Sequence, residues 1–210
     1  MILSHLKGKL GITISILNAP FDGIYKKYES DNFVYSSLRE SDISNQYIGW
    51  LNDTRINTFL EAGKIKQDFV TISNYVNFLR TFRDCDLFTI KYKRKMIHVG
   101  NLTITHNTDF QIGTYGLMIG LSDNPLGSIA AIEASVAIID YIFYEQKKEK
   151  DIQEVNPANL RALKIIHYLG FRRSEIQSTR GYLVFEISNS DWFSRRRNYN
   201  HVSSRARVTN

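Results

Sequence analysis

The sequence predicts an α+β domain in which helices flank one mixed, mostly antiparallel central sheet. In several segments apolar residues recur every three or four positions, the pattern of a helix with one buried face; in others they alternate, which indicates strands. The predicted order is strand, two helices, three antiparallel strands, helix, strand, helix and strand, which is typical of one sheet covered by helices. With 210 residues, 43% of them hydrophobic, the chain can bury a large core as one domain.

The first predicted elements are a strand, two helices and a hairpin. Phe33 to Leu38 is the expected strand, Ser41 the expected N-cap of the first helix, and Thr71 that of the second. Apolar residues alternate over 87–92 and again over 96–105, with a short basic turn between them. We therefore expect these two ranges to pair as a hairpin.

The later elements alternate between strand and helix. In order, they are a strand over 110–120, a helix over 128–144, a strand over 151–155, a helix that ends at Leu169, and a strand over 180–187. The last helix begins either at Asn156 and Pro157 or at Asn159, because both are typical helix starts. Gly170 stands where a left-handed residue ends a helix.

The two ends of the chain differ from the domain, which is expected over 33–193. Residues 1–32 are interpreted as an N-terminal extension, because glycines and a proline interrupt their short apolar runs. Residues 194–210 form a basic tail, which carries much of the net charge of +6. We expect this tail to be solvated, and since no aromatic pattern for stacking on bases accompanies it, nucleic acid is not an expected partner.

Composition excludes several classes of protein. One cysteine cannot build a disulfide framework, and the five histidines form no paired metal-ligand motif, so no metal is expected. Cys85 lies between two aspartates, whose charges disfavour a reactive thiolate. The longest mostly apolar run, Ser128 to Tyr144, contains two acidic residues and is shorter than the roughly 20 residues that span a bilayer. The start of the chain lacks a clear secretion signal, so we expect a cytoplasmic protein without a membrane span.

Two stretches carry the functional signal. In the first, a strand over 115–120 runs through a loop into a helix that begins near Gly127 and Ser128, and a helix N-terminus favours a phosphate group. The second runs from Asn156 to Phe171 and reads as a capped amphipathic helix ended by glycine. Taken alone, either stretch is equally compatible with a structural role.

Together the two stretches resemble the GCN5-related N-acetyltransferase (GNAT) family, over residues 33–193. The resemblance implies that the first stretch binds the pyrophosphate and pantetheine of the cosubstrate acetyl-CoA and that the second packs beside it. The cofactor-binding residues that it implies are Leu117, Met118, Ile119, Gly127, Ser128, Ile129, Ala130, Ala131 and Asn159.

Shorter motifs resemble one branch of that family, the acetyltransferases that modify amino groups on nucleotide-linked sugars. These motifs are 47–53, 98–102, 118–120 and 132–134. The resemblance implies an amino-sugar acceptor, held by Trp50, Asn52 and Asp53, with a homodimer as an open alternative for the assembly. The related branch that acetylates the N-termini of ribosomal proteins is the alternative for the activity.

Two departures from the family pattern raise a third hypothesis, a non-catalytic binding protein of the same fold. Ile129 replaces a glycine, and a β-branched residue would be strained if that position required a positive φ angle. Ile166 stands where the family has a proton-donating tyrosine. Tyr168 is therefore the candidate acid, with Tyr141 and Tyr144 as alternatives.

The candidate base is Glu133, for which tying down a loop is the alternative role, and His106 and Asp53 are weaker candidates. Backbone N–H groups near Met118 would polarise the thioester carbonyl. His98, in a predicted strand, is interpreted as structural.

Overall fold

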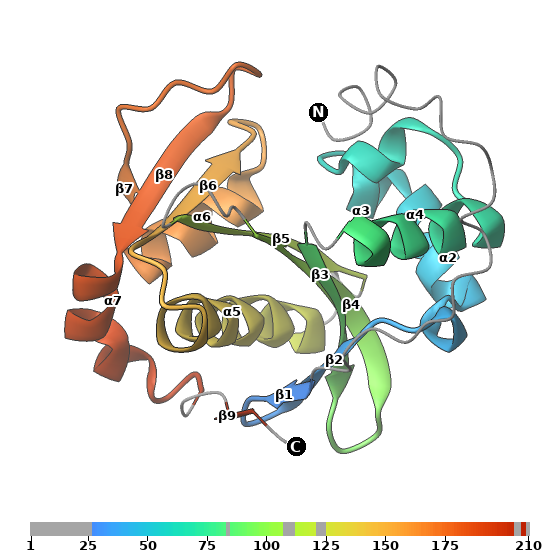
Figure 1. Ribbon diagram of the computed structural model, residues 1–210, viewed down its shortest axis with the longest axis horizontal. Helices are drawn as coiled ribbons and strands as arrows, with labels where there is room; N and C mark the ends of the chain where they lie inside the picture. Colours follow the sequence, from blue (N-terminus) through green and yellow to red (C-terminus); the bar gives the residue numbers. More distant parts are fainter. Residues whose placement is uncertain (1–26, 83–84, 107–111, 121–124, 204–206, 209–210) are drawn as a thin grey trace.

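The computed structural model describes residues 27–82, 85–106, 112–120, 125–203 and 207–208, and these form one mixed sheet with helices on both faces (Figure 1). The strands are β1 (Lys27–Glu29), β2 (Phe33–Ser37), β3 (Cys85–Tyr92), β4 (Ile97–His106), β5 (Ile112–Ile119), β6 (Lys150–Val155), β7 (Arg172–Arg173), β8 (Leu183–Ser188) and β9 (Arg207–Val208). Their order across the sheet is β7-β8-β6-β5-β4-β3-β2-β1-β9. Neighbouring strands are antiparallel except β5 and β6, which are parallel.

The helices lie between the strands in the order that the sequence predicts. They are α2 (Asn45–Asn52), α3 (Thr54–Asn57), α4 (Phe69–Phe82), α5 (Pro125–Asp140), α6 (Leu160–Leu169) and α7 (Asn189–Arg195). Short 3-10 turns are η2 (Glu40–Asp42), η3 (Glu61–Lys64) and η5 (Arg196–Tyr199), and η4 (Tyr141–Glu145) continues α5 as a π-helical turn. The expected α+β class is confirmed.

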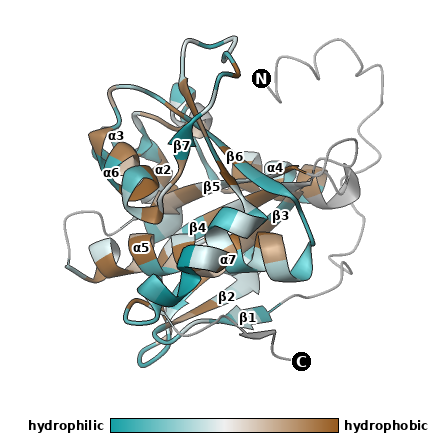
Figure 2. Cartoon of the chain, turned by 90° about the vertical axis from the view of Figure 1, so that its left-hand side faces the viewer, coloured by the Kyte–Doolittle hydropathy of each residue, from teal (hydrophilic) through white to brown (hydrophobic). Residues whose placement is uncertain are grey.

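Each face of the sheet has its own apolar core. On one face α5 packs against side chains such as Phe88 and Ile104, and on the other α2 and α4 pack through Tyr47, Trp50 and Val76. Figure 2 shows the hydrophobic colour concentrated on α5 and the strands beside it. Alternate residues of β5 therefore face different cores, because successive side chains of a strand point to opposite faces.

One helix of the described residues is long and apolar enough to cross a membrane, Pro125–Glu145, which combines α5 and η4. In this fold 72% of its most apolar window is buried inside the protein. Its apolar character is explained by its position at the centre of the core, where nearly every side of the helix meets other side chains.

The starts of α2 and α4 differ from the sequence prediction. Ser44, not Ser41, caps α2 and accepts a hydrogen bond from the N–H of Tyr47. Asp68, not Thr71, provides the capping oxygen at α4 and accepts from the N–H of Thr71. In both cases a second capping residue type stands three positions from the predicted one, and helical periodicity does not distinguish them.

Described residues on both sides of the predicted domain, 33–193, also pack against it. Strand β1 lies in the predicted extension, yet it pairs with β2 from Lys27 to Glu29. In the predicted tail, Arg196 and Tyr199 are buried. Arg196 is buried because the carboxylate of Asp140 compensates its charge, which composition alone does not reveal.

Candidate functional site

The two parallel strands at the centre of the sheet form a fork. β5 and β6 pair only at Ile112 with Lys150 and at Gly113 with Asp151. Beyond these pairs the strands separate, and Figure 1 shows β6 diverging from β5. Within the described part of the chain, Thr114–Ile119 pair with β4 on one side and with no strand on the other. At a rise of about 3.3 Å per residue, this open edge is roughly 20 Å long.

Two helix N-termini lie at the open end of the fork. α5 follows β5 and α6 follows β6, so both helices begin at the carboxyl ends of the two separating strands. An N-terminus carries partial positive charge, and the first turns of both helices lack acidic residues. The open end of the fork therefore favours an anion such as a phosphate.

The structure removes the predicted strain at Ile129. α5 begins at Pro125, which is pre-organised for the first helical position, so all the predicted cofactor-binding residues from Gly127 to Ala131 are helical. Ile129 is 51% exposed, and the described non-glycine residues with positive φ are Met96 and Lys147. The N–H groups of residues beyond the first turn bond within the helix, so a phosphate would meet the amides of the first turn instead.

The second predicted stretch forms α6 with the expected caps. The side chain of Asn159 accepts from the N–H of Ala162, and Gly170 ends the helix at φ 83°. Asn159 thus holds the helix start at the open end of the fork. Ile166 is buried in the core beside Leu169.

Both predicted catalytic side chains have other contacts. Glu133 is fully buried, and its two carboxylate oxygens accept from the backbone and side-chain N–H groups of Asn32, at 2.8 and 2.9 Å. It therefore ties the β1–β2 turn to α5, the alternative role. Tyr168 is 45% exposed, packs edge-on against Tyr199 and has its hydroxyl 3.4 Å from Nε2 of His201. It lies against the C-terminal segment.

The three residues predicted to hold the acceptor make separate contacts. Asn52 bridges to the backbone of Gln67, accepting from its N–H and donating to its carbonyl, both at 2.8 Å. Asp53 caps α3 and pairs with Arg55, which lowers the pKa of Asp53 to about 2. Trp50, in contrast, is buried beside the end of β5, where a Cβ on Gly120 would lie 2.0 Å from its ring.

A polar cluster around His98 also lies at the carboxyl end of β5. From the sequence, His98 is interpreted as a structural residue. His98 Nε2 is 2.7 Å from Oδ1 of Asn101 and 3.0 Å from the carbonyl oxygen of Gly100. Asn101 stands opposite Met118 in the β4–β5 register. The signal that could have found this cluster is the pair of motifs at 47–53 and 98–102, which the fold brings into contact through Trp50 and His98.

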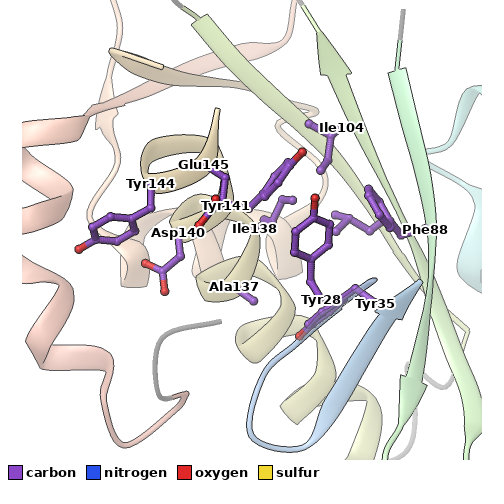
Figure 3. Close-up of a pocket in the computed structure, with 11 residues that line it drawn as sticks. Tyr28, Tyr35, Phe88, Ile104, Ala137, Ile138, Asp140, Tyr141, Tyr144 and Glu145 are labelled. Atoms are coloured by element: carbon purple, nitrogen blue, oxygen red, sulfur yellow. The ribbon is translucent and has the colours of Figure 1, made fainter. Parts of the chain in front are cut away.

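A small cavity lies between the sheet and the C-terminal half of α5 (Figure 3). There Tyr28 packs against both Tyr141 and Phe88. The cavity measures about 20 Å³, room for one or two water molecules, so it cannot hold a cofactor.

Comparison with known proteins places this geometry in a fold family. No protein-family profile and no curated protein sequence matches the chain. Among solved structures, FdhC, a nucleotide-linked sugar GNAT, superposes with a TM-score of 0.68 at 12% identity, covering 84% of this chain and 97% of that one. The chain has the GNAT fold.

Two further solved structures with this fold carry names that indicate other acceptors. A protein described as a ribosomal-protein-serine acetyltransferase from Vibrio cholerae gives a TM-score of 0.63 at 13% identity, over 77% of this chain and 97% of that one. The spermidine N-acetyltransferase of the same organism, in complex with CoA and spermine, gives 0.61 at 16%, over 77% and 98%. The fold of this chain is therefore shared by proteins whose names indicate different acceptors.

Proposed function

We propose that this protein is an acetyl-CoA-dependent N-acetyltransferase whose cosubstrate binds in the fork between β5 and β6. The observation that carries the proposal is the parting of these strands after Gly113 and Asp151, with the N-termini of α5 and α6 at the open end. The solved CoA complex of a spermidine N-acetyltransferase with this fold supports it.

The described residues fit the parts of acetyl-CoA. The open edge of Thr114–Ile119 offers backbone groups to the amides of a linear pantetheine arm, as an edge strand does to an added strand. The first turn of α5 offers a partial positive charge to the pyrophosphate. Ile129 is helical and half exposed, so no backbone strain at this position opposes binding.

Acetyl-CoA supplies the activated acetyl thioester, and the chain has to position it and the amine. Backbone N–H groups at the end of β5, near Met118, would polarise the carbonyl without a special side chain. Holding two reactants in reactive geometry can itself supply much of the rate. A complete set of acid and base side chains is therefore not required for activity.

For the acceptor, we propose an amino group on a nucleotide-linked sugar. The resemblance of the motifs at 47–53 and 98–102 supports this substrate class, as does the superposition on FdhC. The structure adds that these two motifs are in contact beside Gly120. The alternative is a protein N-terminus, supported by the ribosomal-protein-serine neighbour.

The first experiment measures acetyl-CoA binding through thermal stability and calorimetry. A ligand at about 100 times its dissociation constant adds roughly 2.7 kcal/mol to the free energy of unfolding. Absence of any shift at millimolar acetyl-CoA would reject the proposal and favour a non-catalytic protein of this fold. Thiol release with a UDP-linked amino sugar, a peptide with N-terminal serine, and spermidine then separates the acceptor classes.

A variant at the helix start tests where the phosphates bind. Ser128→Asp places a negative charge in the first turn of α5, where it favours the helix but repels a pyrophosphate. We expect weaker acetyl-CoA binding, by tenfold or so, with no loss of thermal stability. Ser190→Asp makes the same change in the first turn of α7 and should leave binding unchanged.

A further inference from the structure

His98 lies where two distant segments meet at the end of β5. Its ring centroid is 5.1 Å from that of Trp50, edge-on, and 5.8 Å from that of Tyr47. Trp50 in turn lies over Gly120, the residue that follows β5. His98 is thus next to the segment that the proposed function assigns to the acetyl thioester, on the α2 face of the sheet.

The hydrogen bonds of His98 determine which ring nitrogen carries the proton. Nε2 lies 3.0 Å from the carbonyl oxygen of Gly100 and 2.7 Å from Oδ1 of Asn101, and both atoms are acceptors. Nε2 must therefore be the N–H donor, and in the neutral ring Nδ1 holds the lone pair. Nδ1 forms no hydrogen bond within the described residues.

The surroundings keep the ring neutral. Burial lowers the pKa of His98, against the opposing effect of its hydrogen bonds to Asn101 and Gly100. The nearest charged groups are Asp42 on η2 and Lys91 on β3, which form an ion pair at 2.6 Å, so their effects on the ring oppose each other. Tyr47 of α2 also borders the ring of His98. Burial raises the pKa of Tyr47 to about 12, so its hydroxyl is neutral.

Asn101 supplies a second, independent observation. It is 4% exposed, and within the described part of the chain its Nδ2 forms no well-aligned hydrogen bond, its nearest polar neighbour being the hydroxyl of Tyr47. A buried amide group without a hydrogen bond lowers stability, so the presence of this one calls for an explanation. The side chain stands opposite Met118, where a bound acceptor could supply the missing acceptor atom.

We propose that His98 is the general base of the acetyl transfer, and that Asn101 is a positioning residue that fixes its tautomer and contacts the acceptor. The inference rests on the proposed function. As the amine nitrogen bonds to the acetyl carbon, its proton passes to Nδ1 of His98. The C–S bond breaks with its electron pair on sulfur, water protonates the thiolate, and His98 later releases its proton to water.

The tautomer is tested by nuclear magnetic resonance of protein labelled with ¹⁵N-histidine. We expect His98 to carry its proton on Nε2, to titrate below the ordinary histidine pKa, and to shift at Nδ1 when a UDP-linked amino sugar is added to the acetyl-CoA complex. Asn101→Leu should weaken the tautomer preference, because only the carbonyl of Gly100 then accepts from Nε2. A proton on Nδ1, or an Nδ1 signal that no amine shifts, overturns the proposal.

Kinetics test the role of the base, with thiol release from acetyl-CoA as the readout. His98→Gln should lower kcat by about 10² or more, remove the acidic limb of the pH profile and leave acetyl-CoA binding unchanged. Asn101→Asp should move that limb to higher pH, because a carboxylate stabilises the imidazolium. A structural role for His98 would produce neither change in the profile.

The control is His167→Gln, which alters an exposed histidine in the last turn of α6 and should keep the wild-type rate and profile. Wild-type protein that fails to bind acetyl-CoA overturns both the proposed function and this inference. Wild-type protein that binds and transfers, with an unchanged profile in His98→Gln, overturns the inference alone.

Discussion

The guanidinium of Arg196 lies against the buried carboxylate of Asp140, with Nε 2.8 Å from both oxygens. Trp192 donates to the same carboxylate at 2.9 Å, and Arg196 also donates to the carbonyl of Ser203. Both charged side chains are almost fully buried. The last turn of α5 is thereby connected to α7 and the C-terminal segment through one ionic group.

Arg196→Met should destabilise the protein by about 3–5 kcal/mol, because it leaves Asp140 as an uncompensated buried charge. Urea unfolding measures the effect, and Arg197→Met at the exposed neighbour is the matched control, with a loss below about 0.5 kcal/mol. The double variant Asp140→Leu/Arg196→Met should recover part of the loss. A single variant as stable as the control would contradict the importance of this pair.

Asp151 should make stability fall as pH rises. Burial raises its pKa to about 8, so the native state keeps a proton that the unfolded chain loses near pH 4. Between about pH 5 and 8 its contribution therefore declines by about 1.4 kcal/mol per pH unit. Asp151→Asn should remove this slope and be the more stable form at pH 8, as urea unfolding at several pH values would show.

The matched control for this titration is Glu175→Gln, at an exposed acidic residue, which should retain the slope. Equal slopes in wild type and Asp151→Asn would mean that Asp151 is ionised in the native state. One carboxylate oxygen of Asp151 accepts from Gln153 at 2.6 Å, and the other has no partner among the described residues. A neutral carboxyl is consistent with that environment.

Gly120→Ala should displace Trp50 from the end of β5. An added Cβ would lie 2.0 Å from two carbons of the indole ring, so either the ring or the strand has to move. We expect a loss of about 1–3 kcal/mol, the usual cost of overpacking, and a changed tryptophan fluorescence spectrum. Gly49→Ala, where nothing lies within 4 Å of the new atom, should be neutral or stabilising.

Ile129→Gly should lower stability without improving acetyl-CoA affinity. The position is helical and half exposed, so glycine relieves no strain and costs about 0.5–1 kcal/mol of helix propensity. Thermal unfolding and calorimetry with acetyl-CoA measure the two effects. Ile129→Ala is the control, because it shortens the side chain and keeps a high helix propensity. If Ile129→Gly binds acetyl-CoA more tightly and Ile129→Ala does not, the backbone at this position has to rearrange on binding.

Part of the candidate site was predictable because its signals are local. Asn159 and Gly170 act within one turn of their own helix, so the residue types there already predict the end of α6 and one of the two starts left open, which the structure places at Asn159. The strand before α5 was predicted by the same kind of pattern. The start of α5 was predicted three residues late, because Pro125 extends the helix into a segment whose glycine resembles a loop.

The roles of individual side chains were less predictable. Glu133 is a candidate base by sequence, and only the fold shows that Asn32, 101 positions away in sequence, donates to both of its oxygens. His98 was interpreted as structural because a lone histidine in a strand is usually so. Its contacts with Asn101 and Trp50 are what make it a candidate base.

The sequence by itself determined the order and type of most elements, since periodicity and capping depend on residues within a few positions of each other. Tertiary structure alone decided that β5 and β6 separate after Gly113 and Asp151, that Arg196 enters the core, and that His98 meets Trp50. These outcomes depend on which distant segments become neighbours and exclude water from each other. No local sequence pattern predicts which distant segments become neighbours.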